Sequence, residues 1–191
     1  MRRLLLALPF ALLPLAASHA ATEHGHTHDD EDHQIQEAAS LAAHEHGAAQ
    51  LNVALSDNTL ELALESPAMN IVGFEHAASS ASDRAVAANA KQQLQDPLAL
   101  FGIAPSASCT VTTAAISSPL FASTAAETTA EHNDVDANYQ LSCSHPEHLQ
   151  GLDLSELFKR FPGTQKIQTQ LVGRNGQQGA ALSPANPRLS F

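Results

Sequence analysis

Histidine is the residue type whose number and spacing most suggest chemistry in this chain. Six of its 11 histidines lie between positions 24 and 46. In the stretch EHGHTHDDEDH, at 23–33, they alternate in an HxHxH pattern beside a run of carboxylates. Zn²⁺ takes imidazole and carboxylate ligands, usually four in a tetrahedral arrangement. The stretch therefore predicts a metal-collecting segment, the alternative being a solvated acidic leader with incidental histidines. Its candidate ligands are His24, His26, His28 and His33.

A second histidine pair lies in AHEHG, just before the first predicted strand. If the strand already runs through this motif, His44 and His46 share a face and point away from the buried side of the strand. Such a pair is a pre-spaced bidentate metal site. Two alternatives stay open: the pair frays at the strand start, or Gly47 bulges the strand and changes which way the side chains point.

The remaining candidates are weaker. Glu75 and His76, in GFEH, would complete the His44/His46 site if the chain folds back, although a hydrogen-bonded, partly buried histidine is an equal alternative. His145 and His148 flank Pro146, which suits the first position of a helix. The two would then lie on one side of it and chelate a metal, unless they are ordinary surface residues. His132, near Asp134 and Asp136, is a thinner cluster in a polar loop.

The chain begins with MRRLLLALPFALLPLAASHA, which has a basic start, an apolar run and a small-x-small ending. These features predict a signal peptide at 1–20, with an uncleaved anchor as the alternative. Residues 21–43 are polar and acidic and are predicted to be a disordered His/acidic tail. Residues 44–191 are predicted to form a single metal-binding domain. No later stretch is long enough to span a membrane, so the cleaved protein is expected not to span one.

Charge and motifs exclude several function classes. Removing Arg2 and Arg3 with the leader moves the formal charge from −11 to −13, which disfavours a nucleic-acid partner. The sequence has no GxSxG, HExxH or P-loop motif and no GxGxxG after a strand, so no enzyme is expected. The two cysteines, Cys109 and Cys143, are expected to form a disulfide in an exported protein. A Cys/Cys metal pair is the rival interpretation.

The hydrophobic pattern predicts an α+β fold of antiparallel hairpins with two or three helices. Alternating leucines and valines predict strands at 50–55 and 59–65, joined by a turn. A capping box at Ser80 begins a predicted helix that runs to Leu94, with Val86 and Ala90 on its apolar stripe. Further strands are expected at 108–116 and 137–144, and a helix at 152–161. A type I′ hairpin is expected at Asn175-Gly176, with a last strand at 188–191.

Several motifs together resemble those of the ZrgA-type periplasmic zinc-binding proteins. They are HEHGAAQLNVAL, LELALESPAMNIVGFEH, the cysteine pair around a polar loop, LFKRFPG and GQQGAALSPANPRLSF. The resemblance covers nearly all of the chain after the leader. It implies a zinc-binding protein of the Gram-negative periplasm that acts beside a zinc ABC transport system. In that family the loop between the cysteine strands tends to be rich in histidine and aspartate, whereas here His132 is its only histidine.

The expected function is therefore periplasmic zinc capture in support of zinc uptake, with transfer to a zinc ABC transporter or its solute-binding protein. His44 and His46 would hold zinc on the folded domain, and the tail would collect it at lower affinity. Binding should weaken near pH 5.5, because imidazoles must be neutral to bind a metal. Three alternatives remain: a copper or nickel metallochaperone, a metallohydrolase, and an envelope adaptor whose His-rich tail is incidental.

Overall fold

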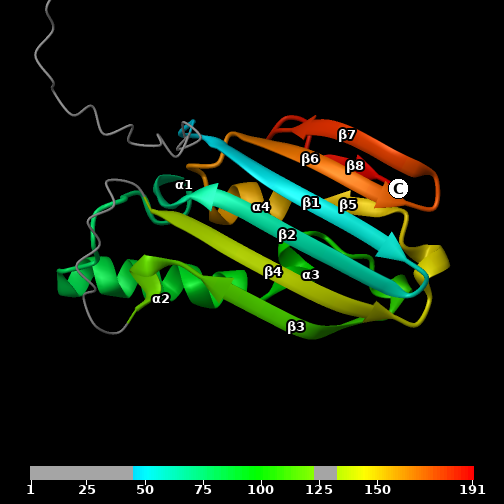
Figure 1. The fold of residues 1–191 in the computed structure, drawn as a ribbon, viewed down its shortest axis with the longest axis horizontal. Coiled ribbons are helices and arrows are strands. Elements are labelled where there is room, and N and C mark those ends of the chain that lie inside the picture. Colours follow the sequence, from blue (N-terminus) through cyan, green and yellow to red (C-terminus); the bar gives the residue numbers. More distant parts are fainter. Residues whose placement is uncertain (1–44, 123–132) are drawn as a thin grey trace, which may run out of the picture. The chain divides into compact units, whose positions relative to one another are not determined.

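A six-stranded mixed sheet forms the body of the protein in a computed structural model that describes residues 45–122 and 133–191. Its strand order is β3-β4-β2-β1-β6-β7, and β5 and β8 form a separate two-stranded sheet (Figure 1). The six strands are β1 Ala48–Ser56, β2 Thr59–Pro67, β3 Cys109–Ser117, β4 Asp134–Cys143, β6 Lys166–Gly173 and β7 Gly176–Leu182. The predicted α+β class, with a largely antiparallel sheet, is confirmed.

The first hairpin follows from local alternation. In β1, Leu51, Val53 and Leu55 are buried while the residues between them are exposed or half-buried. β1 pairs antiparallel with β2 and, on its other side, parallel with β6, where Ala48 lies opposite Lys166. The parallel pair was not predicted. It makes β1 a central strand, so its first residues meet the segment that precedes β6.

Four α-helices are present among the described residues, one more than the upper figure of two or three that was expected. The additional one is α1, a five-residue helix in the apolar stretch after β2. In Figure 1, α3 and α4 lie behind the sheet. The helices are α1 Ala68–Val72, α2 Ala81–Leu94, α3 Pro97–Leu100 and α4 Ser155–Arg160, and the 3-10 helices are η1 Pro105–Ala107, η2 Pro119–Phe121 and η3 Pro146–His148.

Helix α2 begins with the predicted capping box, in which Ser80 and Asp83 exchange side-chain to backbone hydrogen bonds. Its buried stripe differs from the prediction, however. Ala87 is buried, whereas Val86 is 42% exposed. The buried face of the helix therefore runs through Ala87, Ala90 and Leu94. Leu94 also accepts a 2.7 Å hydrogen bond from the buried hydroxyl of Tyr139 in β4 through its carbonyl oxygen.

The last third of the chain departs from the predictions in two places, the helix at 152–161 and the hairpin turn. Helix α4 is shorter than the predicted helix, because Gly151–Asp153 forms β5 and pairs with β8, Arg188–Ser190. The last strand therefore does not extend the main sheet. The β6–β7 turn is not type I′, since that turn needs positive φ at both central residues. Here Gly173 pairs with Gly176, and of the turn residues only Gly176, at φ +93°, lies in that region.

Cys109 and Cys143 form the expected disulfide and are direct partners in the β3–β4 ladder. The bridge joins the start of the edge strand β3 to the end of β4. It closes a loop with a sequence separation of 34 residues. The part of that loop at 123–132, which includes His132, lies outside the described residues.

Candidate metal centre

His46 lies in a tight turn immediately before β1. The Ala48 amide donates a 2.9 Å hydrogen bond to the Glu45 carbonyl, and Gly47 adopts φ +85°. That conformation favours glycine, since other residues adopt it only with strain. The Gly47 carbonyl also accepts hydrogen bonds from the amides of Gln165, at 2.7 Å, and Lys166, at 2.9 Å. The strand therefore begins after His46, and the expected outward-facing strand geometry does not apply to it.

The buried side chain of Asn70 in α1 holds this turn in place. Its Oδ1 accepts a 2.7 Å hydrogen bond from the Gly47 amide, and its Nδ2 donates to the Ala48 carbonyl at 2.8 Å and to Ser66 Oγ at 3.1 Å. Asn70 is only 2% exposed. An amide side chain can donate and accept at once, so one residue satisfies both backbone groups that flank the turn.

The fold brings Glu75 to His46. Oε1 of Glu75 lies 3.2 Å from Nε2 of His46, with the carboxylate side chain 9% exposed and the imidazole side chain 52% exposed. Asn133, which is also buried, donates from its side-chain Nδ2 to the Glu75 carbonyl, and its backbone carbonyl accepts a 2.8 Å hydrogen bond from the Ala68 amide. The backbone after α1 is thus anchored just before the start of β4, which helps to position Glu75 beside His46.

His76 follows Glu75 but makes different contacts. Its ring stacks on Phe74, with centroids 4.8 Å apart, and its Nδ1 lies 3.0 Å from the Ala77 carbonyl oxygen. A carbonyl only accepts, so Nδ1 carries the proton and Nε2 keeps its lone pair. His76 does not form a close three-donor group with His46 and Glu75 in the described part of the chain.

The other predicted ligands of this region, His44 and the tail residues His24, His26, His28 and His33, lie outside the described residues.

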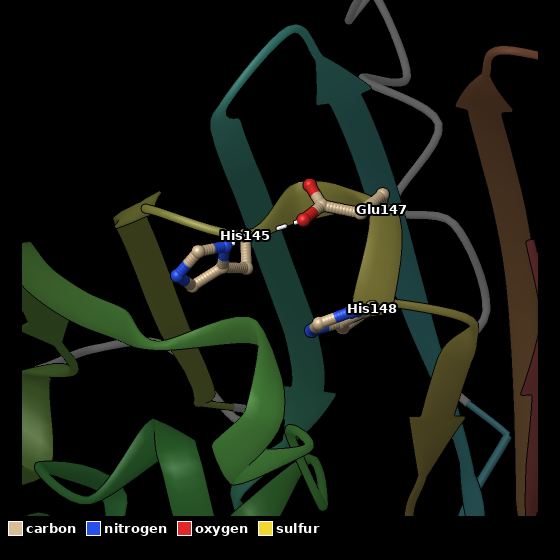
Figure 2. A group of neighbouring side chains, drawn as sticks. All are labelled: His145, Glu147 and His148. Carbon is tan, nitrogen blue, oxygen red and sulfur yellow. Dashed lines mark hydrogen bonds and ion pairs between the residues drawn. The ribbon is translucent and has the colours of Figure 1, made fainter.

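A second group of donors surrounds η3. One potential ligand atom from each of His145, Glu147 and His148 lies within 4.8 Å of the others, and all three residues are exposed. Figure 2 shows Glu147 above the two imidazoles, with a contact to His145. That contact joins Nδ1 of His145 to Oε1 of Glu147 at 3.2 Å. The two predicted histidines, His145 and His148, are therefore brought together. With Glu147 they form the only such group of three or more donors in 45–122 and 133–191.

The electrostatics of this group keep its carboxylate charged. The backbone amide of Glu147 and the imidazole of His145 hydrogen-bond the Glu147 carboxylate and hold its pKa below the ordinary value. A charged carboxylate between two imidazoles is a usual donor set for a borderline divalent cation.

Three residues of these two sites were not identified as important from the sequence: Asn70, Asn133 and Glu147. Glu147 was visible in the HPEH motif, between the two histidines that were singled out. Asn70 is a polar residue inside the apolar stretch PAMNIVGF, a pattern typical of a buried hydrogen-bonding residue. No local pattern distinguishes Asn133, because its partners are about 60 residues away.

Fold and side chains together define an α+β domain with two clusters of imidazole and carboxylate groups. The sequence matches the family described as ZrgA family zinc uptake protein over residues 43–191, and the chain belongs to that family. No curated protein matches the sequence. Within the described residues, no helix is both long enough and apolar enough to cross a membrane.

Proposed function

We propose that this protein captures zinc in the periplasm, supports its uptake and hands it to a zinc ABC transport system. The contact between His46 and Glu75 carries the proposal. Two ligands on a tetrahedral zinc ion, each about 2.0–2.1 Å from the metal, lie roughly 3.4 Å apart. The 3.2 Å between Nε2 of His46 and Oε1 of Glu75 is close to that separation. A zinc ion can therefore bind both atoms with little movement of either side chain.

One of the two ligands is buried and the other is exposed, an arrangement that suits zinc capture. Glu75 is held below the surface by its anchored backbone, whereas His46 is half-exposed and open to solvent. A buried carboxylate is most stable beside a cation. Zinc prefers four ligands, and His44 and His76 are the nearest remaining imidazoles along the chain. We assign them as the further candidate ligands of this centre.

The tail would act before the domain. His24, His26, His28 and His33, with the neighbouring carboxylates, offer many alternative ligand sets at modest affinity, because the chain must be ordered on binding. Zinc collected there would pass to the folded centre and then to the transporter or its solute-binding protein. The signal-peptide pattern at 1–20 and the disulfide between Cys109 and Cys143 both support a periplasmic location, since disulfides persist in oxidising compartments.

Calorimetric zinc titration of residues 21–191 at neutral pH tests this function. His46→Ala and Glu75→Gln should each weaken the tightest site by roughly tenfold or more. The matched control is Glu65→Gln, which removes an exposed carboxylate at the same end of the sheet and should leave the affinity unchanged. Deleting residues 21–43 should remove weak sites and keep the tight one.

The alternatives predict other results. Absence of zinc binding would exclude zinc capture and favour an envelope adaptor. Metal competition at controlled free-ion concentrations tests the other alternative. A preference for copper or nickel over zinc that is larger than the Irving–Williams order predicts would favour a metallochaperone for those ions.

A further inference from the structure

The group around η3 lies far from the proposed zinc centre. The Cys143 amide donates to the Asn58 carbonyl, which places the end of β4 beside the β1–β2 turn. His46 instead precedes the first residue of β1. A nine-residue strand at about 3.3 Å per residue spans roughly 25 Å, so the two groups lie at opposite ends of the sheet and cannot share an ion. Figure 1 shows these ends at the tail and the head of the β1 arrow.

We propose that His145, Glu147 and His148 form a second binding site for a borderline divalent cation such as zinc. The backbone of η3 brings the residues together. A 3-10 helix has three residues per turn, so side chains three positions apart lie almost above one another. The rings of His145 and His148 accordingly face each other, with centroids 5.6 Å apart and planes 26° apart. Glu147 lies between them in the chain and reaches over the same side (Figure 2).

The hydrogen bonds of the two imidazoles leave nitrogen atoms suited to a metal. Nδ1 of His148 lies 3.0 Å from the Ser106 carbonyl oxygen, so this nitrogen must donate and Nε2 keeps its lone pair. Histidine ligands of metals usually have this second hydrogen bond, which fixes the ring orientation. For His145, the 3.2 Å from Nδ1 to Oε1 of Glu147 is again near the separation of two ligands on one zinc ion. A cation can replace the proton shared by that pair.

The segment is anchored on both sides, which lowers the entropy cost of binding. The His145 amide donates to the Ala107 carbonyl at 3.0 Å, and the Ser144 amide donates to the Ser108 carbonyl at 3.2 Å. Cys143, the residue before Ser144, is held by the disulfide to Cys109. After η3, the side chain of Leu149 is buried in the core. The three donors, now within 4.8 Å, need to close by about 1–1.5 Å to reach ligand spacing.

The donor set determines the class of ion. Two imidazoles and one carboxylate suit zinc and its neighbours, whereas Ca²⁺ and Mg²⁺ prefer oxygen ligands only. Three protein ligands leave one tetrahedral position for water or for a group from another molecule. All three residues are exposed, so this ion exchanges with solvent more readily than one beside the buried Glu75.

Nuclear magnetic resonance of ¹⁵N-labelled protein (residues 21–191) tests the site, with zinc chloride as the probe. The ring resonances of His145 and His148 are assigned from the single alanine variants. Zinc should shift or broaden both sets of resonances in the wild-type protein. Glu147→Gln should raise the zinc concentration needed for this change by roughly tenfold or more. The control Glu65→Gln, which removes an exposed carboxylate elsewhere, should not change it.

The variant His46→Ala/Glu75→Gln separates the two proposals. In this variant the resonances of His145 and His148 should still respond to zinc at the same concentrations as in the wild type. The second site is overturned if saturating zinc leaves both sets of resonances unmoved, or if their response disappears with the first centre. If this variant instead keeps the tightest zinc affinity of the wild type, the proposed zinc centre at His46 and Glu75 is refuted, whatever the result for the second site.

Discussion

Gly163 packs directly against the backbone of Asn70. A Cβ atom at position 163 would lie 2.7 Å from the Asn70 carbonyl oxygen and 2.9 Å from its Cα atom. Asn70 in turn holds the Gly47 turn through its side chain. The FPG motif after α4 and the NIVGFEH motif after β2, about 90 residues apart, therefore meet at the turn that carries His46.

This contact predicts that Gly163→Ala is destabilising. Both nearby Asn70 atoms belong to the backbone, so relief requires movement of α1 or of the 162–165 segment, and overpacking of this kind costs about 1–3 kcal/mol. Urea unfolding measures the loss. Gly173→Ala is the matched control, because a Cβ there meets only a leucine methyl group at 3.8 Å. Equal stability of the two variants would contradict the prediction.

Asn70→Ala should reduce both stability and zinc affinity. The substitution leaves the Gly47 amide and the Ala48 carbonyl without their partner, at a cost of about 1–3 kcal/mol for each buried group that stays unpaired. The turn that presents His46 then loosens. Thermal unfolding and zinc calorimetry on the same sample report the two effects. Asn70→Asp keeps the acceptor and loses the donors, so it should have an intermediate stability; a fully stable Asn70→Ala protein would refute the proposed role.

Removing the disulfide should lower the free energy of unfolding substantially. For a loop with a sequence separation of 34, the chain-entropy model gives about 3–4 kcal/mol for Cys109→Ala/Cys143→Ala. Urea unfolding of this variant beside the oxidised wild type measures the difference, and the wild type in reductant should match the variant. The proposed zinc centre at His46 and Glu75 should keep its affinity, because it lies at the other end of the sheet. A loss below about 1 kcal/mol would show that the bridge contributes little.

Stability should decrease in acid partly through Asp153. Hydrogen bonds from the Ser155 hydroxyl and amide, followed by the Arg188 guanidinium, hold the pKa of Asp153 below its ordinary value. A group whose pKa is lowered by folding stabilises the protein above its unfolded pKa, and that contribution is lost as the pH falls through the folded pKa. The effect therefore lies below about pH 4.

The check is urea unfolding at pH 6 and pH 3 for the wild type and Asp153→Asn. The variant should be less stable at pH 6 and should lose less stability on acidification. The control is Glu65→Gln, which removes an exposed carboxylate far from Asp153 in the sequence. Identical pH dependence of wild type and Asp153→Asn would contradict the assignment.

Local signals in the sequence were sufficient for much of the fold. The alternation in β1 and β2, the capping box at Ser80 and the cysteine pair each depend on residues close in the chain or on simple chemistry. Val86 shows the limit of this reasoning. The apolar face of this helix could include either Val86 or Ala87, and only the tertiary packing of α2, which buries Ala87 and leaves Val86 exposed, decides between them.

The candidate sites were less predictable, because their geometry depends on contacts between distant segments. The histidine pair at 145 and 148 was recognisable from spacing in the HPEH motif. The pairing of His46 with Glu75 could be proposed only on the condition that the chain folds back. The parallel pairing of β1 with β6, and the anchoring by Asn70 and Asn133, connect residues whose partners no periodicity indicates.

The exposure of β3 makes the reduced protein prone to aggregation. Of its nine residues only Cys109 and Ile116 are half-buried, and the others are exposed. Few side chains therefore hold this edge strand, and its attachment depends on the ladder to β4 and on the disulfide. If β3 detaches in a reducing environment, the edge of β4 becomes a template for strand pairing between molecules. Aggregation, rather than loss of zinc, is then the first failure of the reduced protein.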